Sequence, residues 1–366
     1  MSGTLPEGGT RYRVEGRFVD GVNGLRMHVL EAGEKGRPGV LLLHGFPELA
    51  YSWRHVMPAL AGAGFHVVAL DQRGYGATTG WDAGYDGDVG SFRLLNLVRD
   101  ALALLDRLGL QTVEAVVGHD FGASVAAWCA LIRPDVFRRV ALMSAPFAGP
   151  PAIGSSRKGM GIDAGLAGLS RPRKHYHDYY SGREANGDMW RAPQGVAAFL
   201  RAYFHMKSAD CPGDDPHPLS GWTAEGLAVL PEYYVMDRGL GMAATVAPHL
   251  LDAASVWLTD RELAVYAEAF GRTGFQGGLN WYRCRTEGWN ADLEVFAGRT
   301  IDVPAVFVAG RRDWGMHQVP GALERMRAVC PRMGAPVVVE GAGHWVQQER
   351  PGAVVEAVLG LLGAGV

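Results

Sequence analysis

The most constraining feature of the sequence is an apolar run that turns at once into a helix of small residues. It reads VVGHDFGASVAAWCA from Val116 to Ala130. Gly118 and Gly122 permit a turn so sharp that the side chain between them, Asp120, projects from the top of a sheet. The helix N-terminus behind the turn favours negative charge there. The sequence therefore predicts a sheet with a helix packed on it. It also places the Asp120 carboxylate at the edge of that sheet, where a substrate can reach it.

Short apolar runs alternate with amphipathic stretches, which is typical of βα units that build a parallel sheet. The expected strands are residues 39–43, 66–70, 113–117, 139–143, 303–309 and 336–339. The expected helices are residues 94–108, 123–132, 321–329 and 352–362. Residues 12–19 and 25–30 alternate around the glycines at 21 and 24, which predicts an antiparallel hairpin before the parallel sheet.

This alternation stops after Pro146 and resumes at about Ile301. The segment between them is rich in Tyr, Trp, His and Gly, and it reads as helices and long loops. We therefore expect an α/β core, with a mostly parallel sheet flanked by helices, made of residues 1–149 and 292–366. An inserted, mainly helical lid of residues 150–291 would close over Asp120.

Composition narrows the possible partners. The 366 residues are 48% hydrophobic and carry a net charge of −3 without long like-charge runs, so nothing indicates binding to nucleic acid or to an anionic membrane. No stretch approaches the roughly 18 apolar residues of a membrane span, and the first residues lack the apolar core of a secretion signal. The four cysteines are too widely separated in the sequence to indicate a disulfide framework or a metal site. We expect a cytoplasmic protein without cofactor or metal, and its oligomeric state stays open.

Two further polar residues follow expected strands. Asp313 comes after VPAVFVAG, and His344 comes after APVVVE and a short glycine turn. Carboxyl ends of parallel strands meet at one edge of the sheet, so both residues should lie near Asp120. The chain order of nucleophile, acid and histidine is the order found in hydrolases with this turn. An aspartate nucleophile is already ionised at neutral pH and forms an ester of the enzyme itself.

The loop after the first parallel strand, HGFPE from His44 to Glu48, predicts an oxyanion hole. In hydrolases of this design, one N–H comes from this loop and another from the residue after the nucleophile. The expected donors are the N–H groups of Phe46 and Phe121.

Four motifs together resemble the epoxide hydrolases of the α/β-hydrolase fold: HGFPE, DQRGYG (residues 71–76), GHDFG and GHW. The similarity runs over nearly the whole chain. It implies the conversion of an epoxide and water to a vicinal diol, without a cofactor, through an ester on Asp120. Water activated by His344 and Asp313 would then hydrolyse this ester.

The resemblance extends into the lid. TGFQGGLNWYR (residues 273–283) is similar to the family segment that carries one lid tyrosine, which assigns Tyr282. HYHDYY (residues 175–180) is similar to the segment carrying the other, and Tyr176 is the best match, with Tyr179, Tyr180 and Tyr203 nearby. Two phenols make chemical sense, because they can hydrogen-bond the epoxide oxygen and protonate it while neutral at pH 7.

Apolar residues next to these motifs predict a hydrophobic epoxide as substrate. Phe46, Phe121, Trp314 and Trp345 should line or border an apolar pocket, together with Pro47.

Other readings fit the residues less well. Haloalkane dehalogenases have Trp after the nucleophile and Asn after His-Gly, where this chain has Phe121 and Phe46 and offers no side-chain N–H to a halide. Haloacid dehalogenases that act on fluoroacetate use arginines beside the nucleophile, where this chain has Phe121 and Ser124. A non-catalytic binder of small ligands is a further alternative, but it predicts damaged catalytic positions.

Overall fold

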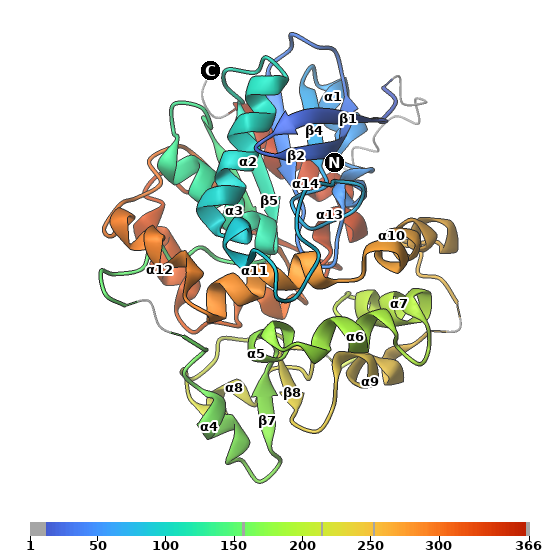
Figure 1. The fold of residues 1–366 in the computed structure, drawn as a ribbon. Helices are drawn as coiled ribbons and strands as arrows, with labels where there is room; N and C mark the ends of the chain where they lie inside the picture. The colour runs from blue at the N-terminus through green and yellow to red at the C-terminus, as the bar shows by residue number, and fades with distance from the viewer. Residues whose placement is uncertain (1–11, 156–157, 214, 252, 364–366) are drawn as a thin grey trace.

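The computed structural model describes residues 12–155, 158–213, 215–251 and 253–363. A central sheet is flanked by helices, and a second group of helices projects beyond one end of its strands (Figure 1). The sheet has eight strands in the order β1-β2-β4-β3-β5-β6-β9-β10. These strands are β1 (Glu15–Val22), β2 (Leu25–Ala32), β3 (Gly39–Leu43), β4 (His66–Leu70), β5 (Ala115–His119), β6 (Val140–Met143), β9 (Ala305–Gly310) and β10 (Val337–Val339).

The pairing of the strands confirms the expected hairpin and the parallel sheet. β1 pairs with β2, and β2 with β4, in antiparallel fashion, whereas all pairs from β4 to β10 are parallel. Strand ends differ from the expected ones by up to three residues. Val113, for example, makes only an isolated bridge to Phe137, so β5 begins at Ala115.

Helices cover both faces of the sheet because its central strands are apolar on both sides. Leu41, Leu43 and Val116 share one hydrophobic cluster with α2 (Leu94–Arg107) and α3 (Phe121–Ile132). The residues that alternate with them, such as Val40 and Leu42, point to the opposite face. There they belong to a second hydrophobic cluster, together with α1 (Met57–Gly62) and α14 (Pro351–Gly363). The core also holds α12 (Ala322–Val329) and α13 (Val346–Glu349). In the described residues, no helix combines the length and the apolar character needed to cross a membrane.

The inserted lid between β6 and β9 is mainly helical, as expected, and lies at the lower end of the molecule in Figure 1. Its elements are α4 (Asp163–Ala167), β7 (Arg173–His175), α5 (Tyr176–Ser181), α6 (Glu184–Trp190), α7 (Val196–Met206), α8 (Ala224–Leu227), β8 (Val235–Asp237), α9 (Met242–Val246), α10 (Asp260–Thr273) and α11 (Gln276–Thr286). The sequence did not predict the antiparallel pair β7–β8, because three-residue strands show no periodicity. The boundaries after residues 149 and 291 stay a prediction.

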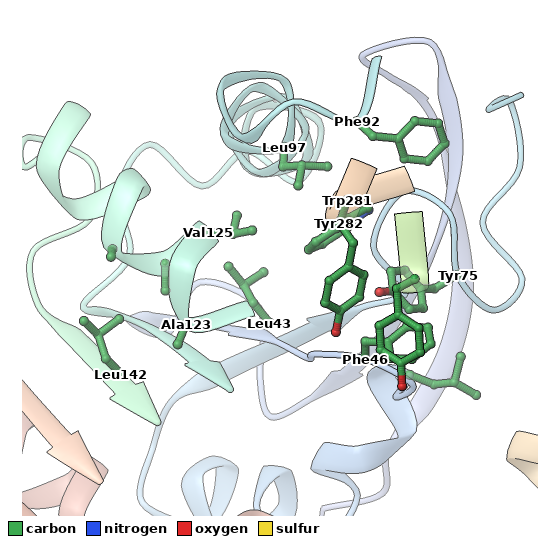
Figure 2. Packing of buried hydrophobic residues seen from close by; sticks show 14 of the residues in the cluster. Leu43, Phe46, Tyr75, Phe92, Leu97, Ala123, Val125, Leu142, Trp281 and Tyr282 are labelled. Atoms are coloured by element: carbon green, nitrogen blue, oxygen red, sulfur yellow. The ribbon is translucent and has the colours of Figure 1, made fainter. Parts of the chain in front are cut away.

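Core and lid share one hydrophobic cluster. Figure 2 shows Leu43 and Ala123 of the core in the same group as Phe46, Trp281 and Tyr282. Trp281 and Tyr282 lie on α11, which runs between the sheet and the rest of the lid (Figure 1). The lid is therefore packed directly on the end of the sheet where Asp120 lies.

Candidate active site

Asp120 alone forms the turn between β5 and α3. Its backbone has φ 53° and ψ −120°, a conformation that non-glycine residues rarely adopt. A Cβ atom on Gly118 would lie 2.1 Å from the carbonyl oxygen of Gly122, so only glycine allows strand and helix to approach this closely. The sharp turn predicted from the sequence is present, and it directs the Asp120 side chain beyond the carboxyl end of the strand.

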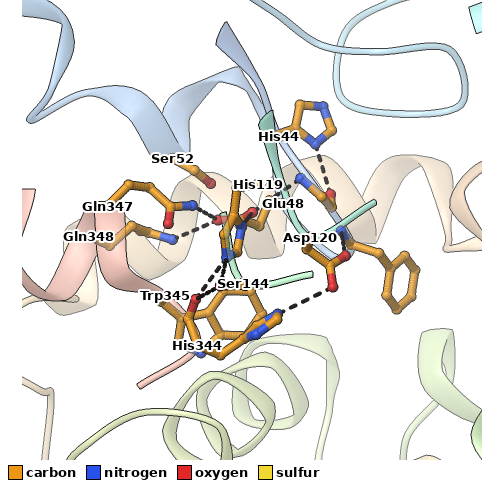
Figure 3. Close-up of polar contacts among 12 residues, drawn as sticks. His44, Glu48, Ser52, His119, Asp120, Ser144, His344, Trp345, Gln347 and Gln348 are labelled. Atoms are coloured by element: carbon orange, nitrogen blue, oxygen red, sulfur yellow. Dashed lines mark hydrogen bonds and ion pairs between the residues drawn. The ribbon is translucent and has the colours of Figure 1, made fainter. Parts of the chain in front are cut away.

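The two oxygens of the Asp120 carboxylate have different neighbours (Figure 3). The Phe46 N–H donates to Oδ1 at 3.1 Å, and Nε2 of His344 lies 3.4 Å from Oδ2. A Cβ on Gly45 would lie 2.4 Å from the Cβ of Asp120, so the loop after β3 rests directly on this side chain. No hydrogen bond from the Phe121 N–H to this carboxylate is present among the described residues.

Asp313 and His344 complete the group that the sequence predicted. Nδ1 of His344 lies 3.1 Å from Oδ1 of Asp313, which also accepts the Gly315 N–H at 2.7 Å. Both side chains are buried. Asp120, His344 and Asp313 therefore form one chain of contacts, with the imidazole between the two carboxylates.

Neighbouring charges set the ionisation of this group. Burial alone would raise the pKa of Asp120, but hydrogen bonding to His344 and the charges of His344 and Lys207 outweigh it, so the pKa lies well below its usual range. Burial also raises the pKa of Asp313, and the charge of His344 outweighs it and lowers the net value. Burial and Lys207 lower the pKa of His344, yet the two carboxylates raise it above its usual value.

Lys207, a buried lysine at the end of α7, was not predicted from the sequence. Its backbone oxygen accepts the His344 N–H at 2.8 Å. Its ammonium lies 5.1–5.6 Å from the ring centroids of four aromatic residues, a cation–π environment. These residues are Tyr203, Tyr233, Tyr234 and Trp345. In the sequence, a lysine at the end of a helix reads as a solvated side chain, so no signal marks it.

The two predicted lid tyrosines lie together close to the turn at Asp120 between β5 and α3, which is called the elbow below. Tyr176 begins α5 and Tyr282 lies on α11, with ring centroids 5.9 Å apart. The Tyr282 ring also lies 5.1 Å from that of Phe121 and 5.5 Å from that of Phe46. Burial first, and then the charge of Asp120, raise the pKa of both phenols well above the usual range. Both hydroxyl groups therefore stay protonated at neutral pH.

The neighbouring tyrosines have other partners. The Tyr179 hydroxyl donates to Asp188, and those of Tyr180 and Tyr203 bond each other at 3.0 Å. The Tyr176 hydroxyl donates to Oε1 of Gln318 at 3.0 Å. These contacts give each candidate for the first lid tyrosine a distinct environment.

Of the residues predicted to contact substrate, Pro47, Trp314 and Trp345 are buried. The Trp345 indole N–H donates to the Phe204 carbonyl at 2.7 Å, and its ring centroid lies 4.6 Å from that of His344. Trp314 lies in η5 (Trp314–Met316), with its ring 5.1 Å from that of His217. Pro47 follows Phe46 through a cis peptide bond. Their contact with substrate stays a prediction.

A second buried network lies behind the elbow (Figure 3). Glu48 accepts hydrogen bonds from the side chains of Gln347 and Gln348 at 2.8 and 3.1 Å, and it contacts Nδ1 of His119 at 2.5 Å. Nε2 of His119 donates to the backbone oxygen of His344 at 2.7 Å. Both residues stand in the motifs HGFPE and GHDFG, but their pairing across the fold could not be read from either motif. The network ties the loop after β3 to the elbow and to the His344 loop.

Together, the parallel sheet, the strained elbow and the adjacent acid and histidine define the class of protein as an α/β hydrolase. A family model described as "alpha/beta hydrolase fold" matches residues 38–159. Among the relatives is epoxide hydrolase A of Mycobacterium tuberculosis, which is 37% identical over 94% of this chain and 96% of its own length.

Solved structures agree with this assignment. Epoxide hydrolase A from Mycobacterium thermoresistibile superposes with a TM-score of 0.75 and 35% identity, covering 96% of this chain and 98% of the other. An epoxide hydrolase from an endophytic Streptomyces gives a TM-score of 0.78 and 32% identity, covering 95% of each chain. The chain belongs to the epoxide hydrolase family of the α/β-hydrolase fold, whose members are hydrolases acting on ether bonds.

Proposed function

We propose that this protein converts a hydrophobic epoxide to a vicinal diol through a covalent ester on Asp120. The observation that carries the proposal is the asymmetric environment of the Asp120 carboxylate. Oδ1 accepts the Phe46 N–H, and Oδ2 is left beside His344. Such an arrangement suits a nucleophile that keeps one oxygen in an oxyanion hole and gives the other to substrate.

In the first step, Oδ2 of Asp120 attacks an epoxide carbon, and the bond between that carbon and the ring oxygen breaks. Tyr282 and Tyr176 hydrogen-bond the ring oxygen, and one of them gives its proton to the developing alkoxide. The raised pKa of both phenols supports this role, because each keeps its proton at neutral pH. The product of the step is a hydroxyalkyl ester of Asp120.

In the second step, Nε2 of His344 takes a proton from water, and the hydroxide formed attacks Cγ of Asp120. The negative charge develops on Oδ1, where the Phe46 N–H already points, with the Phe121 N–H as the second expected donor. Asp313 stabilises the imidazolium. When the ester bond between Cγ and Oδ2 breaks, His344 returns its proton to the departing diol, and the water oxygen remains in Asp120. The second proton of the water leaves the Asp120 carboxyl group and restores the tyrosine hydroxyl that was ionised in the first step.

The aromatic surroundings favour an apolar substrate. The Tyr282 ring centroid lies 5.1 Å from that of Phe121 and 5.5 Å from that of Phe46, the two residues whose N–H groups are the expected oxyanion donors. Turnover of styrene oxide should therefore exceed that of glycidol, which carries a hydroxyl group. A clear preference for glycidol would contradict this part of the proposal.

Two experiments test the ester. His344→Gln should trap it, and mass spectrometry of the peptide containing Asp120 should show a mass increase equal to the whole epoxide. With wild-type enzyme in excess, a single turnover in oxygen-18 water should leave the label in Asp120 and little in the diol. A diol fully labelled in the first turnover, with no trapped adduct, would show that water attacks the epoxide directly.

A further inference from the structure

Lys207 is a buried cation beside the catalytic group, and its N–H donors are unused within the described residues. The side chain is buried, and its ammonium forms neither a hydrogen bond nor an ion pair with any residue that the structure describes. Burial lowers the pKa of Lys207, whereas the charges of Asp120, Asp313 and Glu48 oppose this shift and favour the charged form. A buried ammonium is costly unless its donors meet acceptors, so this position calls for an acceptor that the described residues do not supply.

Aromatic rings hold the ammonium in place without accepting its N–H groups as a carboxylate or a water would. Its nitrogen lies 5.1 Å from the ring centroid of Tyr234 and 5.4 Å from that of Trp345. The Trp345 ring lies in turn 4.6 Å from the His344 ring. The main chain fixes the same position, because the Lys207 backbone oxygen accepts the His344 N–H at 2.8 Å. The ammonium is therefore kept near His344, whose pKa its charge lowers.

Two more polar atoms near Lys207 have no hydrogen-bond partner in the part of the chain that the structure describes. One is the hydroxyl of Tyr234, a side chain that is 2% exposed. The other is Nε2 of His344, which lies 3.4 Å from Oδ2 of Asp120. Tyr234 belongs to this site, because burial and then the charges of Asp313 and Asp120 raise its pKa. Buried polar atoms normally find a partner, and a buried water makes about three hydrogen bonds.

We propose that Lys207, Tyr234 and His344 hold the water molecule that hydrolyses the ester. The ammonium donates a hydrogen bond to the oxygen of this water, which gives one hydrogen to Nε2 of His344 and the other to the Tyr234 oxygen. The second lone pair of the water oxygen then stays free to attack Cγ of Asp120. The ammonium also stabilises the hydroxide that forms as His344 takes the first proton. This role rests on the ester mechanism of the proposed function and adds two catalytic residues to its second step.

The alternative is that Lys207 and Tyr234 donate to the epoxide oxygen during the first step. That oxygen already has two donors in the proposed mechanism, the hydroxyl groups of Tyr282 and Tyr176. The water of the second step has only His344 as an assigned partner. The unused donor of Lys207 and the unused hydroxyl of Tyr234 therefore fit the water better than the epoxide, and separate measurement of the two steps decides between them.

Rapid-quench mass spectrometry of the Asp120 peptide measures ester formation and ester hydrolysis separately. Tyr234→Phe changes no charge, so ester formation should keep its wild-type rate while hydrolysis slows about threefold to tenfold at every pH. Lys207→Met should lower the pH-independent maximum of ester hydrolysis at least about tenfold, and Lys207→Arg, which keeps N–H donors and charge, should retain more of it. If Lys207 acted only through the charge felt by His344, the acidic limb would move and the maximum would stay unchanged. That result would overturn the water site.

Tyr266→Phe is the matched control, because it removes an equally buried lid hydroxyl that bonds Ser52 of the core at 2.8 Å. Neither step should change in this variant. Tyr234→Phe keeps the ring and tests the role even if Lys207→Met does not fold. Slower ester formation with unchanged hydrolysis in Tyr234→Phe would place its hydroxyl at the epoxide and refute the inference, as would wild-type rates of both steps. Failure of His344→Gln to accumulate any ester would instead refute the proposed function.

Discussion

The Phe46 N–H holds Oδ1 of Asp120 at 3.1 Å, so the two oxygens of this carboxylate have different chemical environments. Oδ2, the oxygen facing His344, is the one free to reach a substrate. Because Gly45 packs against the same side chain, the carboxylate has little room to rotate.

Removing the nucleophile should remove the ester. Asp120→Asn replaces a carboxylate by an amide, a poor nucleophile, so turnover should fall at least about thousandfold. The adduct expected in His344→Gln should be absent from the double variant. An adduct of the same mass on the Asp120 peptide of the double variant would contradict the assignment.

Asp313→Asn should slow the second step selectively. An amide at this position cannot stabilise the imidazolium, so hydrolysis of the ester should slow by about thousandfold while its formation continues. Rapid-quench mass spectrometry should detect the ester accumulating during steady-state turnover. Near-normal turnover would show that another acid supports His344.

The lid tyrosines should act only on the first step. Tyr282→Phe and Tyr176→Phe should each slow ester formation about tenfold to a hundredfold, because one donor to the ring oxygen is lost. Tyr179→Phe is the control, since its hydroxyl bonds Asp188 within the lid. If Tyr176→Phe forms the ester at the wild-type rate, the role passes to a neighbouring tyrosine.

Lys207 should set the pH range of the second step. Its charge lowers the pKa of His344, against the carboxylates Asp120 and Asp313, which raise it. A general base must be neutral, so loss of the cation in Lys207→Met should move the acidic limb of ester hydrolysis to higher pH, by about one unit. Lys207→Arg keeps the charge and should move it less. An unchanged limb in Lys207→Met would refute the electrostatic role.

Glu349 should make stability depend on pH. This buried carboxyl group accepts the backbone N–H groups of Ala209, Gly343 and Trp345, and burial raises its pKa to about 7. The folded-state pKa exceeds that of the unfolded chain, so the folded state is favoured at low pH and loses stability as pH rises to about 7. Relative to Glu349→Gln, the wild type should lose about 2–3 kcal/mol of unfolding free energy between about pH 5 and pH 8. A constant difference between the two would contradict this.

The sequence predicted the parts of the site that follow strands. Asp120, Asp313 and His344 each follow an apolar run within a few residues, and parallel strands bring such positions together. Glu48 and His119 could not be paired in this way, because their contact depends on how the loop after β3 packs against the end of β5. Lys207 lies on a lid helix whose place over the sheet is set by tertiary packing. The strands β7 and β8 are too short for their residues to show a period.

The shared hydrophobic cluster of core and lid has a consequence for the evolution and engineering of this chain. Tyr282 and Trp281 of α11 pack with Phe46 and Leu43 of the core, so each half covers aromatic surface of the other. Unfolding should be cooperative across both halves. Transplanting the lid of a relative would require the facing core residues to be exchanged with it, so substrate range should change through coordinated substitutions on both sides of this contact.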